Sequence, residues 1–163
     1  MEMFEKNYWI KPRDSHIVYE ALSAIADGRF ELTGENTAKC TSTSQGKFYE
    51  IELDPKTNSI MSNDNMAFYV GELSYPMVAM LLVKNVIPYD ETIQQYLKDI
   101  KWKNINQKNK NDYMKSVEFV LNLLKEQGVD TEKIRNECDR IYGVVVEMKL
   151  SLLGTKKVPP KAY

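Results

Sequence analysis

The sequence of 163 residues has only two cysteines, one histidine, seven glycines and six prolines. Two lone cysteines, Cys40 and Cys138, exclude a disulfide framework and suit a reducing compartment. The single histidine, His16, excludes paired-histidine metal motifs, and no CxxC pair or phosphate-binding glycine loop occurs. The longest apolar run, residues 77–83, is far shorter than the ~20 residues that a membrane-spanning helix needs. We therefore expect a cytoplasmic protein with no membrane partner, no bound metal and no cofactor.

Charge is distributed unevenly along the chain, although the net charge is only −1. Residues 1–100 carry 9 Lys and Arg against 15 Asp and Glu, whereas residues 101–163 carry 13 against 8. A tryptophan between lysines can stack on a base while the ammonium groups hold phosphates. The alternative is that the tryptophan packs against the helical hairpin and the lysines are only solvated. The candidates for binding single-stranded nucleic acid are therefore Lys101, Trp102, Lys103, Lys108 and Lys110.

The first half of the chain is predicted to form a helix followed by a small sheet. Asp14 or Ser15 can begin a helix that is apolar on one face, and Gly28 is a natural stop. Connections between the strand-like runs are short and contain Gly, Asn, Asp or Pro, which predicts an antiparallel meander. The four runs are residues 29–33, 37–43, 47–53 and 59–62.

The second half is predicted to be mainly helical. A helix capped by Ser74, with Pro76 in its first turn, is apolar on every side, which indicates a buried helix. Another helix is expected to begin near residue 90. Apolar residues then repeat at spacings of three and four on both sides of residues 127–130, which predicts a long antiparallel helical hairpin ending at Gly154. In this hairpin we expect Val117, Leu121 and Leu124 to face Ile141, Cys138 and Ile134.

Together these segments predict an α+β protein. A four-stranded antiparallel meander is flanked by an N-terminal helix and a buried helix, and an α-helical half follows. The two parts, residues 1–86 and 87–163, are expected to pack on each other as one unit. Part of the remaining apolar surface of the last helix must meet either the sheet or a second chain. That surface comprises Val144, Val146, Leu150 and Leu153.

Residues with reactive side chains are few and scattered. His16 falls in the first turn of a helix, where the helix dipole disfavours a positive charge, so a neutral surface histidine is expected. Cys138 lies in an apolar helical stripe and Cys40 alternates with Ala38 along a strand, so both thiols are expected to face the core. No spacing singles out an acid–base pair, so no catalytic residue and no small-molecule substrate is identified.

Residues 20–83 contain a helix, a turn at Gly28, a hairpin that leads into Phe48-Tyr49-Glu50-Ile51, and an apolar helix that starts at Tyr75-Pro76. This layout resembles the SWIM zinc-finger domain, in which a hairpin carries a CxC pair and a CxH pair opens the next helix. The resemblance implies binding to protein or nucleic acid rather than catalysis. None of the residues at the four ligand positions binds zinc, so it also implies a metal-free domain. These residues are Ile60, Ser62, Met77 and Ala79.

These observations favour a non-catalytic module that binds protein or nucleic acid. One alternative is a scaffold that self-associates into a homodimer through the C-terminal helical hairpin. A further alternative is a small enzyme that uses carboxylate or tyrosine chemistry, since the chain contains 10 tyrosines. The enzyme would require a deep pocket lined by two or more titratable groups with shifted pKa values.

If nucleic acid is the partner, its affinity should fall steeply as salt rises, because lysines that contact phosphates displace bound counterions. Replacing Lys101, Lys103, Lys108 and Lys110 with alanine should flatten this dependence. Gel-shift titrations at several salt concentrations measure both effects. No binding to single- or double-stranded DNA or RNA at low salt would exclude nucleic acid as the partner.

Overall fold

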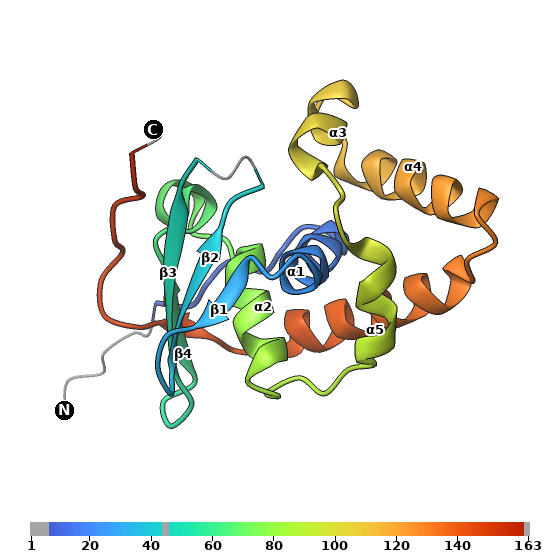
Figure 1. Ribbon diagram of the computed structural model, residues 1–163. Helices are drawn as coiled ribbons and strands as arrows, with labels where there is room; N and C mark the ends of the chain where they lie inside the picture. Colours follow the sequence, from blue (N-terminus) through green and yellow to red (C-terminus); the bar gives the residue numbers. More distant parts are fainter. Residues whose placement is uncertain (1–6, 44–45, 162–163) are drawn as a thin grey trace.

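A computed structural model describes residues 7–43 and 46–161 of the chain. Its strands form one mixed sheet in the order β1-β2-β3-β4-β5 (Figure 1). The strands are β1 (Phe30–Leu32), β2 (Thr37–Thr41), β3 (Phe48–Asp54), β4 (Ser59–Ser62) and β5 (Ser151–Leu152). The α-helices are α1 (His16–Ala26), α2 (Tyr75–Val83), α3 (Trp102–Lys108), α4 (Tyr113–Glu126) and α5 (Thr131–Glu147). A π-helical segment, η1 (Met66–Val70), and a 3-10 helix, η2 (Glu91–Leu97), complete the elements.

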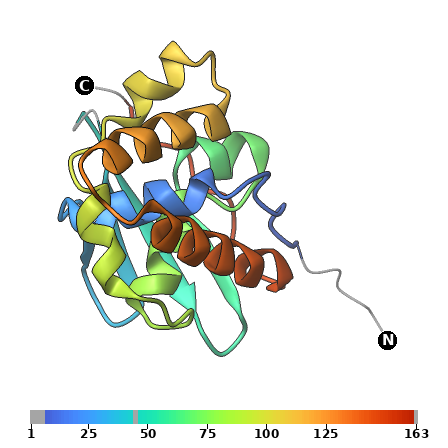
Figure 2. The same cartoon turned by 90° about the vertical axis from the view of Figure 1, so that its right-hand side faces the viewer.

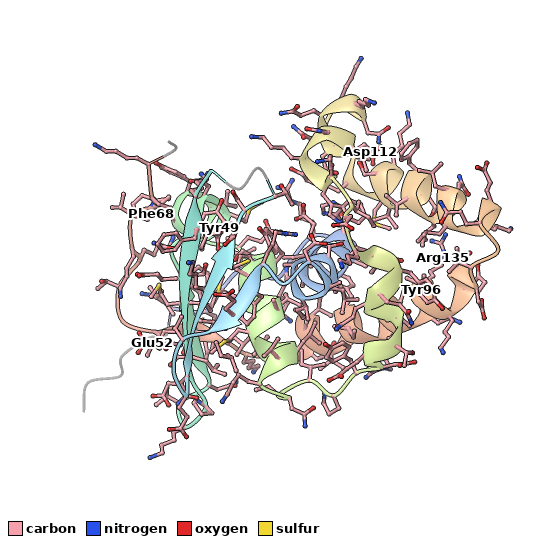
Figure 3. The ribbon with its side chains drawn as sticks, viewed as in Figure 1. Tyr49, Glu52, Phe68, Tyr96, Asp112 and Arg135 are labelled. Atoms are coloured by element: carbon pink, nitrogen blue, oxygen red, sulfur yellow. The ribbon has the colours of Figure 1, made fainter. Side chains whose placement is uncertain are left out.

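Strands β1 to β4 pair in antiparallel fashion, each with its neighbour in sequence. In β3 the side chains of Tyr49, Ile51 and Leu53 are buried and those of alternate residues are exposed or nearly so. Figure 3 shows Tyr49 on the side of the sheet that faces the helices and Glu52 on the opposite side. The α+β class is therefore confirmed, although the predicted meander is only part of a larger, mixed sheet.

The end of the chain departs from the prediction. Helix α5 ends at Glu147 rather than at Gly154, because Met148 already has an extended backbone with a ψ of 139°. Ser151 and Leu152 then form β5, which pairs in parallel with β4. Leu150 is buried as the chain returns to the sheet. Short apolar runs fit both the helical and the strand period, so the spacing alone did not separate the two.

Helix α2 lies at the centre of the molecule. Seven of its nine residues are buried, and it packs on α1, β3 and β4. Ser74 is its N-cap and Pro76 lies in its first turn, where a missing N–H leaves no helical hydrogen bond unmade. The predicted buried helix is therefore confirmed. Neither α2 nor any other helix within residues 7–43 and 46–161 is long and apolar enough to cross a membrane.

Helices α4 and α5 do not pack along their whole length as the predicted hairpin. They approach each other nearer their connecting turn, where Arg135 donates two hydrogen bonds to the Glu118 carboxylate at 2.7 and 3.1 Å. Farther away they diverge, and α1 lies in the opening and contacts both (Figure 2). The apolar face of α1 is buried between these two helices, and Tyr19 of α1 lies beside Cys138 of α5. The buried residues of the predicted seam are Val117, Leu121, Ile134, Cys138 and Ile141.

A single hydrophobic core joins the two predicted parts of the chain, with side chains from Trp9 to Leu150. Trp102 has an exposed fraction of 0%, and its indole N–H donates to the Ser23 hydroxyl at 2.8 Å. A tryptophan has a large apolar ring and one polar atom, and both are satisfied here. Trp102 is therefore not free to stack on a nucleic-acid base, and that prediction is wrong.

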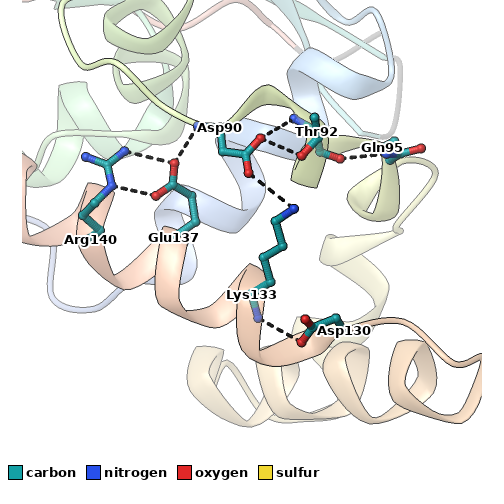
Figure 4. A network of polar contacts seen from close by, with 7 residues as sticks. All are labelled: Asp90, Thr92, Gln95, Asp130, Lys133, Glu137 and Arg140. Carbon is teal, nitrogen blue, oxygen red and sulfur yellow. Dashed lines mark hydrogen bonds and ion pairs between the residues drawn. The ribbon is translucent and has the colours of Figure 1, made fainter.

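Polar contacts fasten α5 to the segment that leads into η2 (Figure 4). The Glu137 carboxylate accepts a hydrogen bond from the backbone N–H of Asp90 at 2.6 Å and another from Arg140 at 2.6 Å. Arg140 also donates to the backbone carbonyl of Pro88 at 2.8 Å. Lys133 and Asp90 form an ion pair at 3.7 Å. The helix expected near residue 90 is thus present as η2, tied to α5 at its beginning.

The positions that correspond to zinc ligands in the SWIM layout lie in the interior. Ile60, Met77 and Ala79 each have an exposed fraction of 0% and belong to the core. Ser62 is also buried, and its hydroxyl donates to Asp64 at 2.6 Å. Since α2 packs on β4, Ile60, Met77 and Ala79 contribute apolar packing between the helix and the sheet.

The buried hydrogen bond between Trp102 and Ser23 can be measured as a coupling energy. Trp102→Phe and Ser23→Ala should each lower the free energy of unfolding by about 1–3 kcal/mol, because each leaves a buried polar group without its partner. The double variant should lose less than the sum of the two, since the same hydrogen bond is lost only once. Urea unfolding of the four proteins gives these energies. Strictly additive losses would contradict the hydrogen bond.

Candidate ligand-binding cleft

A cleft of about 510 Å³ is lined by residues of α1, α3 and the hairpin ends of β2 and β3. Its lining comes from four parts of the chain, within residues 12–20, 42–49, 64–75 and 103–113. These segments are distant in sequence, so only the folded chain forms the cleft. A cleft of this size suits a small organic ligand or the end of a peptide.

Glu20 of α1 lies inside this cleft. Its side chain has an exposed fraction of 23%, and the cleft is what exposes it. Within the described residues no group donates a hydrogen bond to its carboxyl, and the nearest ionisable nitrogen is His16 Nδ1 at 4.0 Å. Burial raises the pKa of Glu20 to about 7, while the positive charge of Arg29 acts in the opposite direction. The carboxyl is therefore close to half ionised at neutral pH.

A polar cluster lies next to Glu20. The Arg29 side chain is 9% exposed and donates to Asp27 at 2.9 Å and to a backbone carbonyl of β2 at 2.8 Å. The Tyr75 hydroxyl lies beside both Arg29 and the Cys40 thiol. Burial raises the pKa of Tyr75 well above its ordinary value and the pKa of Cys40 to about 12. Tyr75 and Cys40 are therefore protonated at neutral pH, and the predicted core position of Cys40 is confirmed.

His16 is buried, so the predicted surface position is wrong. Its exposed fraction is 5%, its ring stacks on Tyr113 with 4.8 Å between centroids, and it meets Trp102 edge-on at 5.1 Å. Burial lowers the pKa of His16 to about 4, so the ring is neutral at neutral pH, as expected. The aromatic neighbours come from residues 102–113, which no local pattern places near residue 16.

Two buried polar atoms in the cleft lining make no well-formed hydrogen bond within the described part of the chain. They are Nε2 of His16 and Oδ1 of Asn106. The two side chains nevertheless lie next to each other, since Asn106 acts as a side-chain hydrogen-bond partner that opposes the lowering of the His16 pKa. A neutral ring with its proton on Nε2 can donate toward Oδ1 of Asn106, although the geometry of this contact is poor.

The other carboxylates of the cleft are occupied by the protein itself. Glu72 accepts from the backbone N–H of Arg13 at 3.0 Å and forms an ion pair with its guanidinium at 3.6 Å. These contacts fix residues 64–75 at the edge of the cleft and leave little capacity for a ligand. Asp64 accepts hydrogen bonds from the Ser62 hydroxyl, the Ser74 hydroxyl and the backbone N–H of Ala67.

The structure separates the predicted nucleic-acid residues. Lys103 lines the cleft together with Lys47, and neither forms an ion pair within the described residues. Lys101, Lys108 and Lys110 are exposed and lie outside the cleft lining. No surface tryptophan accompanies these lysines, since the one in the run is buried. A role for the lysines in binding nucleic acid stays a prediction.

Glu20, Tyr75 and Asn106 were not singled out from the sequence. One signal was available for Glu20, because it follows His16 by four residues and so shares a face of an otherwise apolar helix with it. Tyr75 was noticed only as the beginning of a buried helix. Asn106 reaches the cleft because α3 folds across α1, a tertiary contact that sequence spacing does not report.

The chemistry of the cleft is that of a carboxyl near its pKa among tyrosine and histidine rings. The nearby thiol of Cys40 is protonated, so it is not an active nucleophile. In residues 7–43 and 46–161, no group of three or more His, Cys, Asp or Glu side chains is placed to hold a metal ion. The arrangement suits reversible binding of a polar group, or proton transfer.

Fold and cleft together define an α+β protein with a polar cleft between its helices and the end of a mixed sheet. Residues 10–151 match the family model described as "Uncharacterised conserved protein UCP014422", and the chain belongs to this family. The matched range covers all four segments that line the cleft. Comparisons with curated proteins and with solved structures found no match.

The pKa shifts of His16 and Glu20 have opposite signs and should nearly cancel in the pH dependence of stability. The pKa of His16 is lowered from 6.5 to about 4, so the unfolded chain binds that proton first and roughly 3 kcal/mol of stability is lost as pH falls from 6.5 to 4. The pKa of Glu20 is raised from 4.5 to about 7, so the folded chain binds that proton first and a similar amount is gained as pH falls from 7 to 4.5.

Single substitutions should separate the two effects. Glu20→Gln removes the stability that protonation of Glu20 adds, so this variant should lose stability relative to the unmodified protein as pH falls from 7 to 4.5. His16→Asn removes the stability that protonation of His16 costs, so this variant should gain stability relative to the unmodified protein over the same interval. Urea unfolding across this pH range measures both, with Glu50→Gln on the exposed face of β3 as the control. Parallel pH profiles for all four proteins would show that neither group titrates as described.

Proposed function

We propose that this protein is a non-catalytic binding module whose ligand occupies the cleft between α1, α3 and the β2–β3 hairpin. The observation that carries this proposal is the Glu20 carboxyl, which is held inside the cleft with no donor from the described part of the protein. A partly ionised carboxyl without a donor destabilises the folded state. A ligand that supplies the donor would recover that free energy on binding.

The contrast with Asp64 supports this interpretation. Asp64 lines the same cleft, yet three protein donors occupy its carboxylate. Hydrogen-bond donors to a carboxylate are therefore present in this region, but among the described residues none of them reaches Glu20. A carboxyl that faces a cleft without a protein donor favours a binding site over a structural role.

The size and lining of the cleft favour a small molecule or a peptide end over nucleic acid. Trp102 is buried, and the interior of the cleft presents carboxyl groups that would repel phosphates. No small-molecule ligand was identified from the sequence, because the lining comes from four separate segments. Self-association has less support than the sequence suggested, since Leu150 is buried beside the sheet.

Proton transfer is the second candidate function, and one observation favours it. Glu20 has a pKa of about 7 and lies near the Tyr75 hydroxyl, an arrangement that could accept and return a proton at neutral pH. A bound ligand that is recovered unchanged, as followed by its own NMR spectrum, supports the binding module. Conversion of the ligand that is abolished in Glu20→Gln supports the enzyme.

Blocking the cleft should prevent binding. Gln107 and Asn104 are both exposed on α3, but only Gln107 lines the cleft. Gln107→Trp should therefore weaken ligand binding by about tenfold or more, whereas Asn104→Trp should not. The measurement is an amide NMR titration with small amines, carboxylates and alcohols. Absence of any shift at the lining amides, or equal binding by both tryptophan variants, would refute the proposal.

A further inference from the structure

We propose that the group recognised inside the cleft is a primary ammonium group, which pairs with the Glu20 carboxylate. This inference rests on the proposed function, because it names the chemistry of the ligand for the same cleft. The ammonium could belong to a small organic amine or to the lysine side chain or N-terminus of a polypeptide. Each source presents three N–H donors to an acceptor-rich site.

The local charge balance favours a cation. Among the described residues, Arg29 supplies the positive charge that acts on Glu20, and its guanidinium is already matched by Asp27 at 2.9 Å. Both members of this ion pair are nearly buried, with exposed side-chain fractions of 9% and 12%. An ionised Glu20 therefore leaves one negative charge in the group of three. A ligand ammonium would neutralise it with good hydrogen-bond geometry.

The walls of the cleft also favour a cation. Tyr49, Tyr75 and Tyr113 line it, and aromatic faces attract ammonium groups. The Tyr49 ring already has the Lys47 ammonium at 5.6 Å from its centre, and the Tyr113 ring is stacked on His16. Asn106 is more than nine-tenths buried, and its Oδ1 adds an acceptor to the lining. This oxygen would contribute negative potential to a cation at Glu20.

The positive groups of the cleft are placed farther out or are already engaged. Lys103 is exposed, so solvent screens its charge, and Lys47 is partly exposed with its ammonium over the Tyr49 ring at 5.6 Å. Arg13 is paired with Glu72, and its side chain is 71% exposed. At the positive end of α1, the Asp14 carboxylate accepts a hydrogen bond from the backbone N–H of His16 at 3.0 Å. An ammonium beside Glu20 therefore meets little repulsion.

Affinity for an amine should rise with pH near neutrality. The charged and titratable groups that face Glu20 from the surrounding elements are Asp14, His16, Arg29, Cys40, Tyr49 and Tyr75. Among those with a shifted pKa, only Glu20 titrates between pH 6 and 8. Its ionised fraction rises from about one tenth to about nine tenths over that interval, so affinity should increase by about tenfold.

The probes are butylamine, 1-butanol and butyrate, which share one alkyl chain and differ in the charge of the head group. In amide NMR titrations of the whole chain at pH 8, butylamine should shift the lining amides at concentrations about tenfold below those needed for the other two probes. Glu20→Gln should weaken butylamine by about tenfold and leave 1-butanol unchanged. Glu50→Gln, an exposed glutamate of β3 outside the cleft lining, should bind like the unmodified protein.

One further probe, compared with butylamine, distinguishes a lysine of a polypeptide from a small amine. The probe is lysine whose backbone amino and carboxyl groups are both capped as amides. Its only ammonium group is that of the side chain, next to two peptide-like groups. Binding at least tenfold tighter than butylamine supports a polypeptide partner, whereas equal binding supports a small amine. Both results retain the ammonium assignment.

Two results would overturn the assignment. They are equal shifts by butyrate or 1-butanol, and unchanged butylamine binding in Glu20→Gln. In these cases the cleft still binds ligands, so the proposed function survives without the ammonium. If no probe shifts the lining amides, both proposals fail together.

Discussion

Enclosure of helix α2 is the constraint on which the other elements depend. The helix is apolar on every side, so each of its faces needs an apolar partner to keep it from water. Strands β3 and β4 cover one side and α1 covers another. Helix α1 is in turn covered by α4 and α5, which diverge to admit it. The layered arrangement follows from this sequence of requirements, beginning at the centre.

The position of the cleft follows from the same constraint. The first turn of a helix leaves backbone N–H groups without helical partners, so the N-terminal end of a buried helix needs polar surroundings. Ser74 and Tyr75 begin α2, and the hydroxyl of Ser74 donates to Asp64. Arg29 lies beside Tyr75 at the same end. The polar cluster is therefore located where the apolar core stops, and the cleft opens there.

Elements with strong local patterns were predictable from the sequence, and those set by tertiary contacts were not. The alternation in β3 and the uninterrupted apolar character of α2 identified both elements. The run from Leu150 to Leu153 was assigned to a helix because four apolar or small residues fit either period, and pairing with β4 decided the outcome. The cleft was not predictable, since His16 and Asn106 meet only after α3 folds over α1.

Glu20 and Asp64 line the same cleft but differ in the number of hydrogen bonds that their carboxylates accept. Asp64 accepts three hydrogen bonds, and its removal would disconnect β4, η1 and the beginning of α2. Glu20 accepts none within the described residues, and its burial opposes its own ionisation. A neutral residue of the same shape would serve the fold at least as well at slightly alkaline pH. The charge of Glu20 is therefore the feature of the cleft that the proposed ligand would explain.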